Sequence, residues 1–375
     1  MSEKETKTMM DYIASCPEFI RKNVADSKSL TAPFVEEYVN GGYKNIWIVA
    51  CGSSSNGSLC ARQFIRRHLR CEVKIVAPFT FVTSEHDFGD TDMVIIVSQS
   101  GYSLNALDAV KVVKQKGRRC IGLTGDLESD LAKACDVAAN YGVGRETVAY
   151  VTRGVTTLAL FFMLFATDAA EKLGIKTEAE AGTVRKQLLA AADINEKVQA
   201  SWTPFLKEHY QKLTGMTKTY VCGVGANIGT ACEGALKFGE TISIPTCAYE
   251  IEEYIHGPNI QMTPEYCVFL IDGGEGTERI HQIYEGTRIV TSNAYLITNC
   301  AAYKDEPNTF YVACDLPEEI TPLCYLPIFQ MTAFRITEDL SRWLKHPLQR
   351  KMEKLVSSKS ANYENSPFSE DTPGR

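Results

Sequence analysis

The chain has 375 residues, of which 45 % are hydrophobic and 23 % charged, so it is long enough for two globular domains of ordinary size. A net charge of −7 without a long basic run argues against nucleic-acid binding. A polar start and a longest apolar run of nine residues, at 158–166, argue against a signal peptide and a membrane span.

Residues 1–43 are predicted to be helical, because apolar side chains such as Ile20 and Val24 recur there at helical spacing. An α/β unit is expected over residues 44–170, where apolar strands alternate with helical stretches. This pattern is typical of right-handed βαβ units and a parallel sheet. The strands expected in this unit are 46–50, 73–76, 93–97, 120–124 and 137–140.

Residues 171–215 are predicted to form a helical linker, and a second α/β unit is expected over 216–345. The tail 346–375 is expected to be partly disordered, since from Ser357 it is rich in Ser, Asn, Pro and acidic residues. Thirteen cysteines, none in a CxxC or CxxH pair, predict reduced thiols in a cytoplasmic protein.

Two polar turns follow strands of the first unit. The sequence S-Q-S-G-Y-S at 98–103 lies between an apolar strand and a helix, and C-G-S-S-S at 51–55 has the same setting. Backbone N–H groups and a helix dipole at such a turn favour an anion, and serine hydroxyls add donors without fixed charge. The pattern predicts one phosphate-monoester site. Taken alone, however, the turn at 98–103 would be explained equally well by a simple helix cap at Ser103. Neither a P-loop nor a GxGxxG fingerprint is present.

The second unit repeats the order of elements but not these letters. Its turn at 272–277 reads D-G-G-E-G-T, and two carboxylates there would repel a phosphate. We therefore expect one phosphate site per chain, in the first unit.

The two serine turns resemble the phosphate loops of the sugar isomerase (SIS) domain family. This resemblance implies an α/β fold of two tandem SIS domains, each a flavodoxin-like three-layer sandwich with a parallel sheet. The segment 144–157 resembles the stretch that shapes the sugar pocket in this family, with Val151 in place of a pocket serine and Arg153 in place of a lysine. Glu146 could instead only cap the next helix. The phosphate- and sugar-binding residues that the resemblance implies are Gly52, Ser53, Ser54, Ser98, Gln99, Ser100, Ser103, Ala149, Val151 and Lys237.

The stretch E-G-A-L-K at 233–237, then Glu240 and H-G-P at 256–258, resembles the catalytic region of glucosamine-6-phosphate synthases. By that resemblance Glu240 is the base that moves a proton between C1 and C2 of the sugar. His256 would open the ring, reaching into a neighbouring subunit of a homodimer. A solvated glutamate and a turn histidine are the alternative interpretation. Ile255 stands where the synthases have a lysine.

Two short stretches, Glu275 with Arg279 and K-H-P-L at 345–348, resemble SIS deglycases that act on 6-phosphorylated Amadori compounds. The start M-S-E lacks the nucleophilic cysteine and glutaminase domain of the synthases. A deglycase is therefore predicted, with a ketose–aldose isomerase or aminosugar-phosphate deaminase as the alternative and a non-catalytic sensor as a third possibility. No cofactor, nucleic-acid or membrane partner is expected. No metal is expected either, because His256 and Glu253 alone make no ligand set.

Overall fold

The computed structural model describes residues 7–369 and divides the chain into two compact units. The first unit comprises residues 1–189 together with 344–375, and the second comprises 190–343. The expected linker is therefore shared between them, because its long helix α8 (Glu178–Glu208) runs across the boundary at residues 189 and 190.

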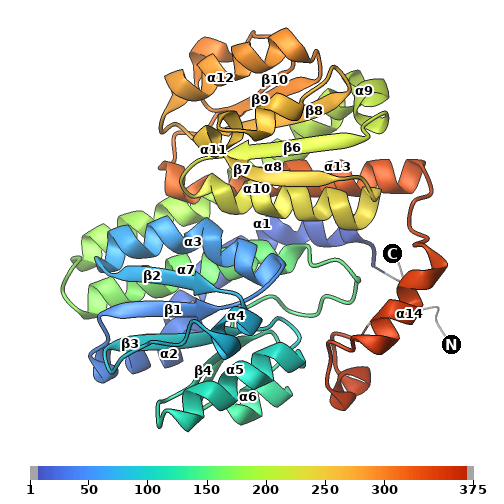
Figure 1. Ribbon diagram of the computed structural model, residues 1–375. Helices are drawn as coiled ribbons and strands as arrows, with labels where there is room; N and C mark the ends of the chain where they lie inside the picture. Colours follow the sequence, from blue (N-terminus) through green and yellow to red (C-terminus); the bar gives the residue numbers. More distant parts are fainter. Residues whose placement is uncertain (1–6, 370–375) are drawn as a thin grey trace, which may run out of the picture. The chain divides into compact units, whose positions relative to one another are not determined.

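The first unit is built on a five-stranded parallel sheet of order β2-β1-β3-β4-β5 (Figure 1). This is the flavodoxin-like strand order, which places a ligand crevice at the carboxyl ends of the strands. The helices of this unit pack in two groups, α1, α2 and α3 with α7, and α4 and α6 with α5. Its elements are α1 (Met9–Ala25), α2 (Ser27–Gly41), β1 (Asn45–Val49), α3 (Ser53–Leu69), β2 (Glu72–Val76), α4 (Pro78–Thr83), β3 (Asp92–Val97), α5 (Leu104–Gln115), β4 (Ile121–Thr124), α6 (Asp130–Ala134), β5 (Val137–Asn140) and α7 (Arg153–Lys172).

Helix α7 is the centre of one layer, and its side chains from Arg153 to Ala170 are buried. Phe34 of α2 packs edge-on against Phe161 and Phe165 of this helix. Among the described residues α7 is the one helix long and apolar enough to cross a membrane, but 94 % of the relevant window is buried inside the protein. Burial on all sides explains why its sequence is apolar around the whole circumference.

The second unit repeats this topology, with a parallel sheet of order β10-β9-β8-β6-β7. Counted along the chain, the order is again 2-1-3-4-5, so the predicted tandem duplication of a flavodoxin-like fold is confirmed. The edge strand β7 was not predicted. The elements of this unit are α9 (Tyr210–Thr214), β6 (Lys218–Gly223), α10 (Asn227–Lys237), the π-helix η1 (Phe238–Ile242), β7 (Thr246–Glu250), α11 (Ile251–Ile255), η2 (Pro258–Gln261), β8 (Tyr266–Asp272), α12 (Thr277–Val290), β9 (Ala294–Thr298), η3 (Ala301–Tyr303), β10 (Thr309–Tyr311), η4 (Glu318–Ile320) and α13 (Pro322–Asp339).

The chain after residue 343 returns to the first unit. Helix α14 (Pro347–Leu355) is followed by residues 357–369, here called the C-terminal segment, which contain η5 (Ala361–Asn365). The expectation of disorder is corrected for this segment, because its backbone is hydrogen-bonded to the β3–α5 loop. The Leu104 amide donates to the Ser358 carbonyl at 3.0 Å, and the Ser360 amide donates to the Tyr102 carbonyl at 2.8 Å. The amino-acid composition of the segment alone does not indicate such a long-range pairing.

Candidate active site

The loop between β3 and α5 forms the floor of a pocket in the first unit. Ser98 and Ser100 are buried, and Ser103 is the N-cap residue of α5, where its side chain makes no capping hydrogen bond. The Ser98 hydroxyl donates to Ser103 Oγ at 3.2 Å and accepts the Gly101 amide at 3.2 Å. Gly101 is required here, since its φ is +75° and a Cβ would lie 2.1 Å from Ser129 Oγ.

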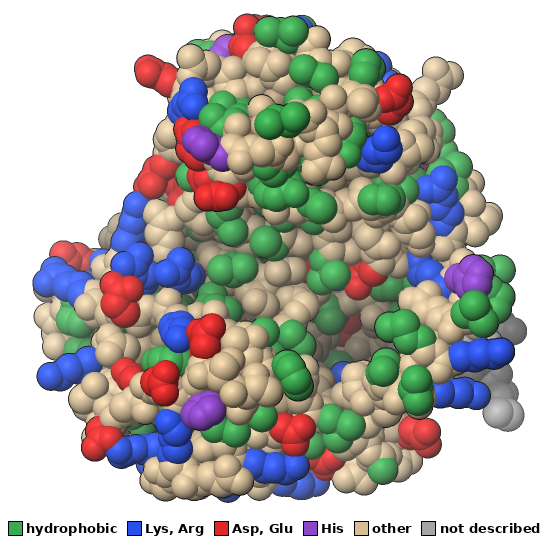
Figure 2. Space-filling view, viewed as in Figure 1, with side chains coloured by type: hydrophobic (Ala, Val, Ile, Leu, Met, Phe, Trp, Pro, Cys, Tyr) green, Lys and Arg blue, Asp and Glu red, His purple; other side chains and the backbone are tan. Residues whose placement is uncertain are grey.

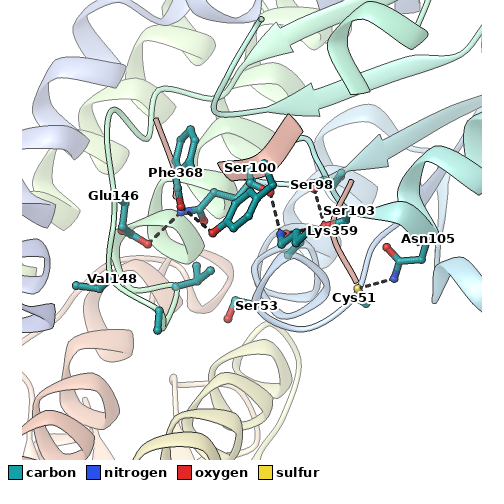
Figure 3. Close-up of a pocket in the computed structure, with 16 residues that line it drawn as sticks. Cys51, Ser53, Ser98, Ser100, Ser103, Asn105, Glu146, Val148, Lys359 and Phe368 are labelled. Carbon is teal, nitrogen blue, oxygen red and sulfur yellow. Dashed lines mark hydrogen bonds between the residues drawn. The ribbon is translucent and has the colours of Figure 1, made fainter. Parts of the chain in front are cut away.

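The pocket has a volume of about 230 Å³ and lies where the β1–α3 and β3–α5 loops meet (Figure 3). Both loops lead into the first turn of a helix, so amide N–H groups and two helix dipoles favour an anion there. Gly52 caps α3 with a φ of +58°, beside the lining residues rather than among them. The predicted residues that line the pocket are Ser53, Ser54, Ser98, Gln99, Ser100, Ser103, Ala149 and Val151.

Glu146 combines the two roles considered for it. Its buried carboxylate lines the pocket and accepts the Thr152 amide at 2.9 Å and the Gly154 amide at 3.1 Å, which caps α7. It also accepts the side-chain amide of Gln99 at 3.1 Å. Its oxygens therefore accept three donors that orient Gln99 and the start of α7.

Arg153 does not line the pocket, although by the family resemblance it stands where the synthases have a lysine. Its guanidinium stacks over the Phe19 ring at 3.6 Å and donates to the carbonyls of Val143 and Arg145. Burial lowers the pKa of this guanidinium despite the nearby carboxylate of Glu146. In this chain Arg153 links the loop before α7 to helix α1.

The structure adds pocket residues that the sequence did not indicate. Lys359 of the C-terminal segment donates to Ser100 Oγ at 2.9 Å and to Ser103 Oγ at 3.2 Å, as Figure 3 shows. A lysine in a polar tail has no periodic or local signal that would mark it as a site residue. The other lining residues outside the predicted set of site residues are Cys51, Val97, Asn105, Val148, Tyr363 and Phe368.

The second unit holds a buried charged cluster at the end of α10. The Lys237 ammonium lies 3.0 Å from Glu233 Oε1 and 2.5 Å from Glu240 Oε1, and the Lys237 side chain is 1 % exposed. Burial alone would lower the pKa of Lys237, but the two carboxylates raise it above its usual value. Lys237 therefore stays charged and is paired with Glu240, whose side chain is 29 % exposed.

Glu240 lies on the π-helix η1, where the hydrogen-bond pattern of α10 widens by one residue. His256 lies exposed at the C-terminal end of α11, before Gly257 with a φ of +146°. Its Nδ1 is 2.6 Å from the Glu252 carbonyl oxygen. Because a carbonyl only accepts, Nδ1 carries the hydrogen and Nε2 is the acceptor of the neutral ring.

Sequence comparison matches the chain to one domain family and to two named relatives. Residues 43–167 match the SIS domain. The chain is 26 % identical over 301 residues to the glutamine–fructose-6-phosphate aminotransferase [isomerizing] of Pyrobaculum aerophilum, covering 78 % of this chain and 48 % of that protein. The protein of the same name from Thermotoga maritima is 27 % identical over 252 residues, 64 % of this chain and 40 % of that one. The chain thus spans about half or less of the length of these relatives.

Solved structures share the fold. A protein of Clostridium difficile 630, provisionally assigned as a phosphosugar isomerase, matches with a TM-score of 0.86 at 21 % identity, over 95 % of this chain and 100 % of that one. The C-terminal domain of glucosamine-fructose-6-phosphate aminotransferase from Francisella tularensis matches at 0.81 and 18 % identity, over 92 % and 100 %. The glucosamine-6-phosphate deaminase of Thermotoga maritima matches at 0.67 and 19 %, over 87 % and 95 %.

Proposed function

Because residues 43–167 match the SIS domain and the chain is homologous to part of the glutamine–fructose-6-phosphate aminotransferases, we propose that it is a phosphosugar deglycase. Its substrate would be a 6-phosphorylated Amadori adduct, of the fructosamine or glucosamine 6-phosphate type, of an amino acid. One water is consumed, and the products are a hexose 6-phosphate and the free amine.

The observation that carries the proposal is the hydroxyl-lined pocket at the start of α5. Ser98, Ser100 and Ser103 present hydroxyls beside first-turn amides, a donor set suited to a phosphate monoester. On the face shown in Figure 2, Lys and Arg side chains are interspersed with Asp and Glu, so that face offers no broad basic surface for a polyanion.

The chemical step is assigned to residues of the second unit. Glu240 would take a proton from C1 of the open-chain ketoamine, giving an enolamine, and return it at C2, giving an imine at C1. Water then adds at C1, and the C1–N bond breaks to release the amine and the aldose phosphate. Lys237 would hold the Glu240 side chain in position through their ion pair, and Nε2 of His256 would take or give the proton that opens the sugar ring.

Two further stretches support a deglycase by resemblance. Arg279 on α12 pairs with Glu252 at 2.6 Å, and His346 caps α14 by accepting the Leu348 amide. The second candidate is a ketose–aldose isomerase or aminosugar-phosphate deaminase, which the names of the relatives favour and which would use the same Glu240 and His256.

The test is to incubate the purified chain separately with a 6-phosphorylated fructosamine, with fructose 6-phosphate alone and with fructose 6-phosphate plus ammonia. Amine and hexose 6-phosphate released from the first substrate, and lost in Glu240→Gln, would support the deglycase. Interconversion of hexose phosphates alone would favour the isomerase. Binding of every compound without turnover would leave the sensor.

The proposal includes a cytoplasmic homodimer with shared sites. The location is supported by the cysteines, because all thirteen are free thiols. Mixed dimers of a Glu240→Ala chain and a His256→Ala chain should recover part of the activity, because one site would then hold both intact residues. Verified heterodimers without any recovery would show that each site takes Glu240 and His256 from the same chain.

A further inference from the structure

Three side chains that can bind a metal ion converge beside α12 in the second unit. His281 and Glu285 are four residues apart on this helix, so their side chains share a face. Glu306 joins them from the loop between η3 and β10. One ligand atom from each of the three lies within 4.8 Å of the other two. This cluster contains neither His256 nor Glu253, the residues on which the expectation of no metal is based.

The imidazole of His281 is held in place by packing rather than by a hydrogen bond to Nε2. Its ring stacks on the Tyr303 ring, with the centroids 3.7 Å apart and the planes 8° from parallel. The Nε2 atom is buried and has no hydrogen-bond partner among the described residues. A buried polar atom without a partner is rare, because its lost hydration costs free energy. Metal ions are frequent ligands of a neutral imidazole nitrogen.

The backbone around Glu306 is fixed by hydrogen bonds of its own. The Glu306 amide donates to the Tyr303 carbonyl at 3.2 Å. The side-chain amide of Asn308 donates to the carbonyls of Ser292 at 2.9 Å and Ala294 at 3.1 Å, which ties the loop to the start of β9. A site with ligands on such fixed backbone loses less entropy when it binds an ion.

Arg288 shows that this cluster attracts a cation. Its Nη1 lies 3.2 Å from Glu285 Oε1 and 3.6 Å from Glu306 Oε2, so one guanidinium nitrogen bridges the two carboxylates. The side chains are 30 % exposed in Arg288, 52 % in Glu285 and 36 % in Glu306. Ion pairs this exposed contribute little to stability, so a metal ion that binds both carboxylates can displace the guanidinium into solvent.

We propose that His281, Glu285 and Glu306 form a binding site for a divalent transition-metal ion, with zinc as the best match. Zinc accepts one imidazole and two carboxylates, and water would take its fourth tetrahedral position. Ligand atoms at zinc lie roughly 3.4 Å apart, so rotation of the two glutamate side chains must close the present spacing by roughly 1.5 Å or less. The imidazole disfavours magnesium and calcium, which prefer oxygen ligands. The ion would join α12 to the loop before β10 and takes no part in the proposed chemical step.

The experiment titrates zinc chloride into the full chain and follows binding by calorimetry. One zinc ion per chain should bind at the cluster. Glu306→Gln, which preserves the size of the side chain, and His281→Ala should each weaken this binding by about tenfold or more. The matched control is Glu278→Gln, which removes an exposed carboxylate of the same helix outside the cluster. This control should bind zinc like the unchanged chain.

Arg288→Met distinguishes a metal site from a cluster that serves only as an ion-pair network. Without the guanidinium the two carboxylates have no competing cation, so zinc should bind more tightly, by up to about tenfold. Unchanged or weaker zinc binding in Arg288→Met would overturn the proposal. Equal zinc binding in the unchanged chain, His281→Ala and Glu306→Gln would also overturn it, because the zinc would then be held elsewhere, for instance by the free thiols.

Thermal melting shows whether a variant has lost the ion or the fold. Zinc should raise the melting temperature of the unchanged chain in a concentration-dependent way, because it binds the folded state. Glu306→Gln should melt at the same temperature as the unchanged chain without zinc and should show a much smaller rise with zinc. An equal rise in both chains would contradict the site. These measurements use no sugar phosphate, so the proposed deglycase activity can fail without affecting them.

Discussion

The β3–α5 loop of the first unit and the β8–α12 loop of the second occupy the same place in the same topology, yet only one is open to an anion. In the first unit, serine hydroxyls line a pocket. In the second, the Asp272 carboxylate accepts the Gly274 amide at 2.9 Å, the Thr277 hydroxyl at 2.9 Å and the Thr298 hydroxyl at 2.7 Å. The protein's own carboxylate thus takes donors that a phosphate would need.

The neighbouring loop of each unit shows the same contrast. Ser53 and Ser54 line the pocket after β1, whereas after β6 the buried carboxylate of Glu318 accepts the Ala226 amide at 3.0 Å. The same position in a flavodoxin-like unit can therefore be open to an anionic ligand or be occupied by a carboxylate of the protein itself. The second unit instead carries the charged cluster at Glu240.

The variant Glu240→Gln should separate phosphate binding from the chemical step most clearly. We expect kcat to fall by roughly 10² to 10⁴, the usual contribution of a general base, while fructose 6-phosphate binding is nearly unchanged. Steady-state kinetics with calorimetry measures both. Near-full turnover in this variant would remove Glu240 from the chemical step.

Placing an acidic residue in the serine loop of the first unit, as in the corresponding loop of the second, should abolish phosphate binding there. Ser100→Asp places a carboxylate where a phosphate would bind, and two like charges about 4 Å apart repel by about 4 kcal/mol near a protein surface. Binding of fructose 6-phosphate should weaken on the order of a hundredfold or more. Ser100→Ala should weaken it less, by about 1.5 to 3 kcal/mol for one hydrogen bond to a charged group.

The matched control is Thr277→Ala in the second unit, whose hydroxyl donates to Asp272 and not to the pocket. Its affinity for fructose 6-phosphate should equal that of the unchanged chain. An equal loss in Thr277→Ala and Ser100→Ala would contradict the assignment of the phosphate to the first unit.

Removing the Asp272 carboxylate of the second unit should lower the stability of the protein rather than its binding of fructose 6-phosphate. Asp272 is 1 % exposed, and Asp272→Ala leaves its donors in the β8–α12 loop without an acceptor. We expect a loss of about 1 to 3 kcal/mol in the free energy of unfolding for such unsatisfied groups. Urea denaturation would measure it, and an unchanged midpoint would show that the loop does not depend on this carboxylate.

The smallest effect concerns pH. The pKa of Lys237 is raised by Glu233 and Glu240, so its stabilising contribution is complete below the unfolded pKa near 10.4 and is lost as pH rises towards the higher folded value. The stability difference between the unchanged chain and Glu233→Gln/Lys237→Met should shift by up to about 1.4 kcal/mol per pH unit above that point. A difference that stays constant between pH 8 and 11 would contradict the raised pKa.

The sequence alone determined the duplicated α/β fold and the location of the serine loops. The strands predicted at 46–50 and 93–97 correspond to β1 (Asn45–Val49) and β3 (Asp92–Val97), because a buried parallel strand must be continuously apolar. The serine loops were visible because the donors for an anion come from consecutive residues at a strand-to-helix turn.

Only the tertiary structure decided which distant groups complete the site. Strand β7 was missed because an edge strand, T-C-A-Y-E, has no buried run to mark it. Glu146 orients Gln99 across 47 positions, Arg153 turns towards Phe19, and Lys359 reaches Ser100 across 259. These contacts depend on where folding brings separate segments together, and a periodic or local pattern in one chain carries no information about that.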